Sequence, residues 1–197
     1  MTVINSRRFF LMAAIYSVLE PRLIFASQQN TAMEIVDQAV SKINNIINSG
    51  DTQTQMLRSF ERMFNVYADV PTIAKYALGR DVRTASEDQL KAYIKAFSGY
   101  FSNKYGKRFR EFIGGKIEII SVVKIKNYYS VNTIAHMPAY EPFEVDFLVS
   151  DRSGQPLVFN LIIEGVNMLL AERQEIGALL DRNLGKIDAL IADLTVP

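Results

Sequence analysis

The sequence predicts an α+β fold in which N-terminal helices pack on a curved, four-stranded antiparallel sheet that is followed by a C-terminal helix. Two observations carry this prediction. Apolar residues recur at helical spacing in the first and last parts of the chain, but they alternate with a period of two between Lys116 and Ile163. The connections between the alternating segments are short, which favours an antiparallel meander with one apolar face and one wetter face.

The N-terminal segment has the order of a secretory signal, in which a basic stretch precedes an apolar one. Arg7 and Arg8 come before the apolar run 9–19, which is shorter than the roughly 20 residues that a membrane-spanning helix needs. Residues 6–11 also resemble the twin-arginine export motif. We expect a signal peptide at 1–26 and a single domain with a helical annex at 27–197. An ordinary buried N-terminal helix is the alternative.

Local signals predict where the helices begin. Thr31 and Glu34 have the spacing of a capping box, and Ser86 and Gln89 repeat that spacing. Asp69 stands where an N-cap belongs. Apolar periodicity then predicts helices from Thr31 to Ser49, from Met56 to Tyr67, from Asp69 to Gly79 and from Ser86 to Tyr105. It also predicts one final helix from Leu169 to Leu194, which is interrupted at 183–185.

The alternating segments predict four strands. In the first strand, Ile117, Ile119, Val123 and Ile125 are expected on the apolar face, and Lys124 is expected on the opposite face. The remaining strands are expected from Tyr129 to Met137, from Phe143 to Val149 and from Leu157 to Ile163, with a turn at 151–156. A strongly twisted sheet of this kind forms a cone whose inside is either filled by side chains or open to a ligand.

The composition excludes several classes of function. The chain has no cysteine, so disulfides, thiolate metal sites and cysteine nucleophiles are impossible. A formal net charge of +1 without a basic stripe gives no reason to expect nucleic acid as a partner. No cluster of His, Asp and Glu has metal-ligand spacing, and no Gly-rich loop opens a helix after a strand, so neither a metal nor a cofactor is expected.

Nothing in the sequence points to catalysis. His136 is the single histidine, and it is expected on the polar face of its strand, as are Glu144 and Asp146 on theirs. The chain is therefore not expected to be an enzyme. A small-molecule isomerase or dehydratase is the alternative, and it would require Asp146 or His136 to point into the cone.

Several segments between Asp69 and Leu194 carry a resemblance to a known family. They are DVPTIAKYALG at 69–79, residues 89–97, Tyr105, IEGVN at 163–167, and Arg173. Together they resemble the MlaC family, also called the toluene-tolerance auxiliary family. The chain departs from the family's pattern at Val82, where the family often has tryptophan, and at Asn160 and Asn167, where it usually has aspartate and serine.

The resemblance implies a periplasmic phospholipid-binding shuttle between the inner and outer membranes. Members of this family enclose the acyl chains of a phospholipid and leave its head group in water, inside a sheet that resembles the NTF2-like cone. The implied partners are an inner-membrane ABC transporter with an MCE-protein ring and an outer-membrane lipoprotein–porin complex. The implied role is the maintenance of outer-membrane lipid asymmetry.

Apolar residues on the concave face of the sheet, together with aromatic residues of the helices, are the expected wall of the lipid cavity. The expected lipid-binding residues are Tyr76, Phe97, Phe101, Ile119, Val123, Val131, Val145, Phe147, Phe159 and Leu161. Each of them is equally compatible with ordinary core packing. A ligand-free periplasmic adaptor with a filled core is therefore a further alternative.

Overall fold

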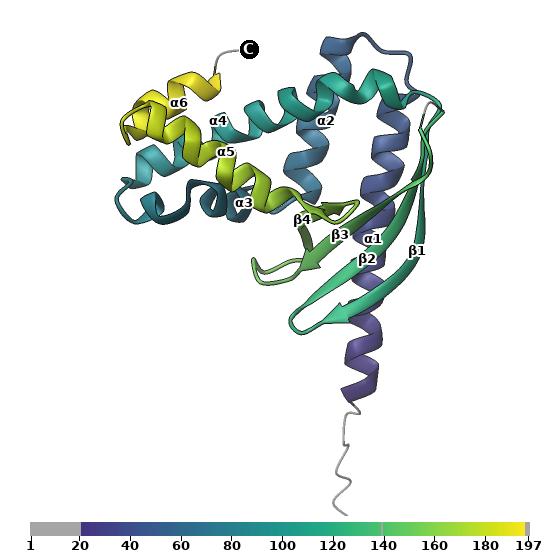
Figure 1. Ribbon diagram of the computed structural model, residues 1–197. Coiled ribbons are helices and arrows are strands. Elements are labelled where there is room, and N and C mark those ends of the chain that lie inside the picture. Colours follow the sequence, from purple (N-terminus) through teal and green to yellow (C-terminus); the bar gives the residue numbers. More distant parts are fainter. Residues whose placement is uncertain (1–20, 139, 196–197) are drawn as a thin grey trace, which may run out of the picture.

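The computed structural model describes residues 21–138 and 140–195, with the backbone alone at 21–27 and 108–110. Its elements (Figure 1) are α1 (Pro21–Ile47), α2 (Gln53–Tyr67), α3 (Val70–Leu78), the 3₁₀ helix η1 (Gly79–Arg83), α4 (Glu87–Gly106), the 3₁₀ helix η2 (Lys107–Phe112), β1 (Lys116–Ile125), β2 (Tyr128–His136), β3 (Phe143–Ser150), β4 (Leu157–Ile163), β5 (Val166–Asn167), α5 (Met168–Arg182) and α6 (Ile187–Thr195). This order confirms the predicted α+β fold. Residues 1–20, the larger part of the expected signal peptide, lie outside the described residues.

The strands form one antiparallel sheet in the order β1-β2-β3-β4-β5, which confirms the predicted meander. The short strand β5 was not predicted. It exists because Glu164 and Gly165 both have positive φ, 47° and 79°, and so form a tight two-residue turn. This turn brings Val166 back beside Ile163 and leads directly into α5.

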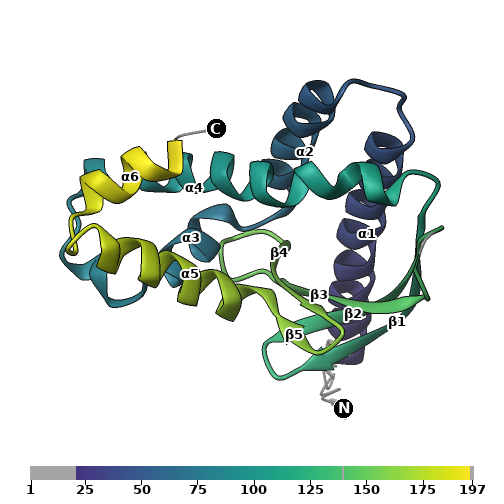
Figure 2. The same ribbon diagram turned by 45° about the horizontal axis from the view of Figure 1, so that its top comes forward.

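Helix α1 lies across the concave side of the sheet, and β1 and β2 curve around it (Figure 1). The remaining helices form an annex to one side, in which α3 and α5 lie below α4 and α6 (Figure 2). The annex is joined to the sheet where Asp69, between α2 and α3, donates its backbone N–H to the Val158 carbonyl oxygen of β4 at 2.8 Å. No described helix is long and apolar enough to cross a membrane.

Three buried clusters hold these layers together. The sheet core, between α1 and the strands, consists of Ala32, Val36, Val40, Tyr129, Val131, Ala135, Met137, Val145, Phe147, Val149 and Val158. The helical core, inside the annex, consists of Phe64, Val70, Ile73, Ala74, Ala77, Leu78, Tyr93, Ala96, Phe97, Ile176, Leu180, Ile187, Leu190 and Leu194. The junction cluster, where α1 meets α2, consists of Ile46, Ile47, Met56 and Phe60.

The predicted helix starts are confirmed at two positions and wrong at one. Asp69 accepts the backbone N–H of Thr72 as an N-cap, and Ser86 and Gln89 form a reciprocal capping box. Thr31, in contrast, lies in the middle of α1, which begins at Pro21. A capping box needs a non-helical chain before it, and the residues that precede Thr31 are already helical.

A β-bulge in β1 overturns part of the predicted apolar face. The register with β2 shifts between Ile119 and Ser121, so that Val122 pairs with Val131 and Val123 is the next residue along. One extra residue moves every later side chain to the other face of the sheet. The inward placement of Val123 and Ile125 was therefore wrong: these side chains are 49% and 37% exposed.

A second irregularity affects β4. Leu148 of β3 pairs with Asn160, but its neighbour Val149 pairs with Val158, which leaves Phe159 without a partner on β3. Val158 consequently joins the sheet core, whereas Phe159 packs edge-on against Tyr128 with ring centroids 5.5 Å apart. The inward placement of Phe159 was wrong for the same physical reason as that of Val123.

Candidate functional site

The apolar layer between α1 and the sheet is the candidate site. On the helix, Ala32, Val36 and Val40 recur at intervals of four and form one stripe that faces the strands. On the sheet, alternate residues of β2 and β3 face this stripe, and Val131 pairs directly with Phe147. Because both surfaces are aliphatic or aromatic, the layer offers hydrocarbon-like surroundings along the length of the helix.

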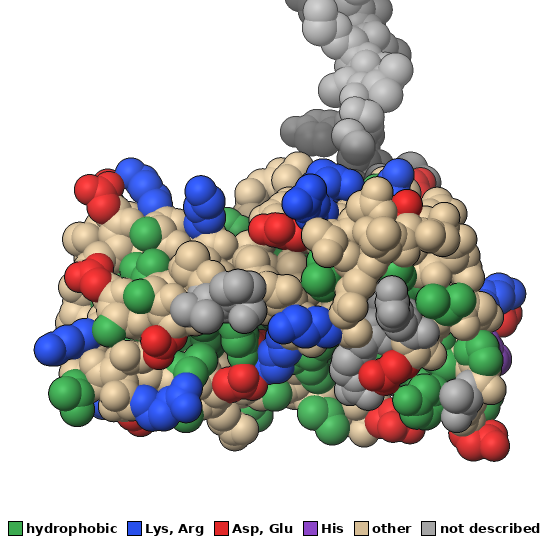
Figure 3. Space-filling view, turned by 90° about the horizontal axis from the view of Figure 1, so that it is seen from above, with side chains coloured by type: hydrophobic (Ala, Val, Ile, Leu, Met, Phe, Trp, Pro, Cys, Tyr) green, Lys and Arg blue, Asp and Glu red, His purple; other side chains and the backbone are tan. Residues whose placement is uncertain are grey.

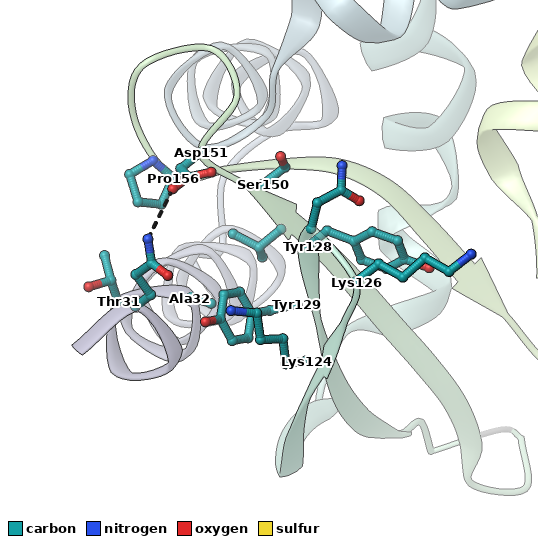
Figure 4. Close-up of a pocket in the computed structure, with 12 residues that line it drawn as sticks. Thr31, Ala32, Lys124, Lys126, Tyr128, Tyr129, Ser150, Asp151 and Pro156 are labelled. Carbon is teal, nitrogen blue, oxygen red and sulfur yellow. Dashed lines mark hydrogen bonds between the residues drawn. The ribbon is translucent and has the colours of Figure 1, made fainter. Parts of the chain in front are cut away.

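A pocket of about 230 Å³ opens at one end of this layer. It lies between the N-terminal half of α1, the β1–β2 hairpin and the β3–β4 loop (Figure 4). The residues that line it are Gln28, Thr31, Ala32, Lys124, Lys126, Asn127, Tyr128, Tyr129, Val149, Ser150, Asp151 and Pro156. Ala32, Tyr129 and Val149 also belong to the sheet core, so the pocket is the open end of the apolar layer.

Tyr129 forms part of the pocket wall and carries a buried hydroxyl group. The residue is 8% exposed, and its hydroxyl oxygen has no hydrogen-bond partner. The ammonium Nζ of Lys124 lies 5.5 Å from the centroid of the Tyr129 ring, within cation–π range. The bulge in β1 is what places Lys124 on this face, beside Tyr129 of the neighbouring strand.

The adjacent hairpin turn directs a second lysine elsewhere. Lys126 occupies the turn with φ of 52°, a left-handed conformation that fits a two-residue hairpin. Its side chain runs away from the Tyr129 ring, alongside Tyr128 on the opposite side of the strand (Figure 4). Lys124 is therefore the lysine that lies beside the buried hydroxyl group.

Two exposed hydrogen bonds hold α1 to the sheet at this end. The Gln28 side chain donates to the Asp151 carboxylate at 3.4 Å, and the Gln29 side chain donates to the Val122 carbonyl oxygen at 3.3 Å. Exposed hydrogen bonds of this length contribute little net free energy, because water replaces them readily. Among the described residues, these two hydrogen bonds therefore contribute little to holding α1 against this end of the sheet.

The structure brings together half of the residues that the sequence singled out. Val131, Val145 and Phe147 are buried in the sheet core, and Ile119 and Leu161 are partly buried against it. The Val123 and Phe159 side chains lie outside this cluster.

The other three predicted residues lie in the annex. Phe97 is fully buried in the helical core, and Phe101 stacks on Phe64 with ring centroids 4.4 Å apart. Tyr76 is 41% exposed, beneath the guanidinium group of Arg173 at 5.0 Å from its ring centroid. Of these three, Phe101 alone packs against the junction cluster. Phe112 packs against both the junction cluster and the sheet core, and so connects that cluster with the apolar layer.

Sequence reasoning missed Lys124 and the hydroxyl group of Tyr129 as site residues. Plain alternation placed Lys124 on the outer face, and nothing in the local sequence marks the bulge that moves it. Tyr129 was expected only as the first residue of a strand, and its position at the open end of the layer depends on how α1 lies across the strands.

The alternative isomerase or dehydratase would require Asp146 or His136 inside the cone, and neither side chain lies there. Asp146 accepts a hydrogen bond from the Asn132 side chain at 2.7 Å, on the face opposite Val145. The His136 ring is exposed, with Nε2 3.7 Å from a Glu118 carboxylate oxygen. Among the described residues, no group of three or more His, Cys, Asp or Glu could hold a metal ion.

One buried charge cluster lies elsewhere, between α4 and α5. Glu172 is 1% exposed and accepts hydrogen bonds from Lys104 Nζ at 2.7 Å and from the Tyr105 hydroxyl group at 2.5 Å. Burial, followed by the hydrogen bond to Glu172 and then by the negative charge of Glu172, raises the pKa of Tyr105, so this hydroxyl remains a donor at neutral pH. The cluster fastens two helices together and lies apart from the pocket.

Comparison with known proteins gives two findings. The family model of the MlaC protein matches residues 34–196 of this chain. The fold is similar to the solved structure of a phospholipid-binding protein from Ralstonia solanacearum in complex with a phospholipid, with a TM-score of 0.71 and 15% sequence identity. The similarity covers 83% of this chain and 94% of that protein.

Proposed function

Because the chain belongs to the MlaC family, we propose that it binds a phospholipid and carries it through the periplasm between the two membranes. The proposed site for the acyl chains is the apolar layer between α1 and the sheet. Ile119, Val131, Val145, Phe147 and Leu161 are the proposed lipid-contacting residues of the strands. The protein acts as a binding protein and has no catalytic residue in this proposal.

The observation that carries the proposal is an apolar layer with an opening to water at one end. A phospholipid needs hydrocarbon-like surroundings for its chains and an exit for its polar head group. The sheet core supplies the first, and the pocket beside Tyr129 supplies the second. The Ralstonia protein of similar fold was solved with a phospholipid bound, which supports the same class of ligand here.

Loading requires the layer to widen. The pocket measures about 230 Å³, whereas sites for drug-sized ligands span about 300–1,000 Å³ and a phospholipid with two chains is larger still. The α1 stripe is made of the small side chains of Ala32, Val36 and Val40. When α1 moves away from the sheet, the apolar surface that becomes exposed is therefore covered again by the acyl chains.

The energetics fit a carrier. A buried CH₂ group contributes about 0.8 kcal/mol, so two chains of about 16 carbons offer on the order of 20 kcal/mol relative to water. A bilayer offers the same chains a comparable gain, so exchange between protein and membrane is nearly balanced. Near-balanced exchange needs a smooth apolar surface and no reacting group.

The wider transport role extends the same proposal. Residues 1–26 serve as an export signal, and the mature protein exchanges lipid with an MCE-type ABC transporter in the inner membrane and a lipoprotein–porin complex in the outer membrane. Charged side chains of both signs are interspersed over the face seen in Figure 3. The formal net charge is +1 for the full chain and −1 after loss of Arg7, Arg8, Arg22 and Glu20 with residues 1–26. Such a surface favours recognition by protein partners over attraction to anionic lipid in general.

The small size of the pocket favours a second candidate, a periplasmic adaptor with a filled core. Val36 and Val131 are completely buried, so the layer is packed at its centre. An adaptor would use the outer surfaces of the same fold and would carry no ligand.

Native mass spectrometry of the mature protein, purified without detergent, separates the two candidates. We expect one phospholipid per protein, identified by extraction of the lipid from the purified sample. A protein that is empty and also fails to take lipid from liposomes would contradict the carrier and leave the adaptor. The variant Phe147→Asp places a carboxylate in the sheet core, so it should lose the lipid, whereas Val123→Asp on the outer face should retain it.

A further inference from the structure

We propose that Lys124 and the Tyr129 hydroxyl group bind the phosphate of the phospholipid head group at the open end of the apolar layer. This inference rests on the proposed function, and it assigns to one pocket a chemical preference that the apolar layer alone does not supply. The layer would accept any pair of acyl chains. The pocket would select those that carry a phosphodiester.

The Tyr129 hydroxyl group is the first observation. It is buried in the pocket wall without a hydrogen-bond partner, although a buried hydroxyl group almost always has one. Its position marks the transition from the apolar layer to the lysine-bearing rim. A phosphate oxygen that enters the pocket would accept this hydrogen, and such a bond to a charged acceptor is short and strong.

Lys124 is the second observation. A β-bulge moves this lysine from the outer face to the rim of the apolar layer, and its ammonium group then lies 5.5 Å from the Tyr129 ring centroid. A donor hydroxyl group and an ammonium group on neighbouring strands form a pair suited to a tetrahedral anion. Figure 4 shows both side chains on the α1 side of the hairpin.

The remaining charges of the pocket are compatible with an anion. Asp151 also lines it, but its carboxylate accepts the Gln28 side-chain amide on the opposite wall. Lys126 lines the pocket from the hairpin turn, with its ammonium group directed to the other side of the strand. Within the described pocket, the ammonium group beside the buried hydroxyl group is therefore that of Lys124, and the single carboxylate, that of Asp151, lies on the opposite wall against Gln28.

Two soluble lipids with the same chains test the inference. Dioctanoyl phosphatidylglycerol carries the phosphodiester and dioctanoylglycerol lacks it, and the affinity of each is measured by titration calorimetry below its aggregation concentration. We expect the full mature protein to bind the phosphatidyl lipid at least about tenfold more tightly, the factor that one charge-assisted hydrogen bond supplies. Tyr129→Phe and Lys124→Gln should each remove most of that preference, because each should lower the affinity for the phosphatidyl lipid more than the affinity for dioctanoylglycerol.

Stability separates a binding role of Tyr129 from a structural one. Because the hydroxyl group has no partner in the protein, Tyr129→Phe should have an unchanged or higher melting temperature in the absence of lipid. A structural hydroxyl group would instead lower the melting temperature when removed. Lys126→Gln is the matched control, since it removes a lysine from the same hairpin and should keep the preference.

The outcomes that overturn the inference are distinct from failure of the carrier. Equal affinity for the two lipids in the unaltered protein, or a preference that survives both variants, would leave a phospholipid carrier without this phosphate site. Inorganic phosphate that binds as tightly as the phosphatidyl lipid would make the site one for free phosphate. Absence of binding by both lipids would contradict the proposed function itself.

Discussion

Val122 and Val123 are adjacent on β1 and have opposite surroundings. Val122 packs against the sheet core and pairs with Val131 of β2, whereas the Val123 side chain is 49% exposed on the outer face. Both residues are β-branched and have the same intrinsic preference for a strand. Any difference between them in their effect on stability therefore measures which face of the sheet is buried.

We expect Val122→Ala to lower the free energy of unfolding by about 1 kcal/mol more than Val123→Ala does, because only the first loses packing in a core. The propensity cost of replacing valine in a strand is common to both and cancels in the comparison. Urea denaturation followed by circular dichroism measures the two values. Equal losses, or a larger loss for Val123→Ala, would place the bulge elsewhere in β1.

The same bulge explains why the alternation of apolar residues predicted some residues of the candidate site correctly and others wrongly. Alternation placed Val131, Val145 and Phe147 in the sheet core, because β2 and the first half of β3 are regular. It failed for Val123 and Phe159, which follow or occupy irregular positions. A bulge depends on pairing with a neighbouring strand and leaves no mark in the local sequence.

At the scale of elements, α4 and α5 are joined by a charge cluster. Lys104 contacts both Glu172 and Glu175, and Glu175 also accepts a hydrogen bond from the Tyr100 hydroxyl group. Burial alone would raise the pKa of Glu175, but the hydrogen bonds from Lys104 and Tyr100 and the charge of Lys104 together lower it below its ordinary value. The folded protein therefore prefers this carboxylate ionised.

This shift has a defined sign in the pH dependence of stability. A carboxyl group whose pKa is lower in the folded state contributes stability above its unfolded pKa, and this contribution disappears as the pH falls through the folded pKa. We expect Glu175→Gln to be less stable than the unaltered protein at pH 6, by under about 1 kcal/mol because the pair is partly exposed. The difference should shrink as the pH falls below 4.5, the ordinary pKa of a glutamate, as measured by urea denaturation at a series of pH values.

Glu34→Gln is a suitable control, because Glu34 is exposed in the middle of α1, away from the cluster and from the helix N-terminus, where a carboxylate would be stabilised by the helix dipole. A constant deficit of Glu175→Gln at all pH values would indicate lost packing and contradict the electrostatic account.

Helix boundaries such as Asp69 and Ser86 could be predicted, because a cap is a signal within four residues. The Lys104–Glu172 pair could not, because its partners are far apart in the sequence and meet only when the annex folds.

At the scale of the whole molecule, the sheet with α1 and the helical annex have separate cores that meet at a small junction cluster. The order of helices and strands predicted this arrangement in outline, since each amphipathic element must cover its apolar face. Whether the space under α1 is filled or open could not be predicted. The answer depends on how closely one helix approaches the strands, and the same residues pack in both cases.

The proposed loading movement separates α1 from the sheet at the pocket, so a tether across the pocket should stop it. Gln28 and Asp151 lie on opposite walls with their side chains in contact, and the chain has no native cysteine to interfere. We join Gln28→Cys and Asp151→Cys by a short bis-maleimide and measure the uptake of fluorescent phospholipid from liposomes. We expect the rate of uptake to fall to about one tenth or below, which corresponds to an activation barrier raised by about 1.4 kcal/mol.

The same double variant treated with a monofunctional maleimide is the control, because it fills the same space without joining the walls. If α1 moves, the monofunctional adduct exchanges lipid normally and only the cross-linked protein is slow; protein that is loaded before cross-linking should also retain its lipid. If both adducts are equally slow, the reagent obstructs the pocket and nothing is learned from the tether alone, so the retention of pre-loaded lipid decides. Rapid loss of lipid from cross-linked protein would show that acyl chains leave by another route and that this end of the layer is not the entrance.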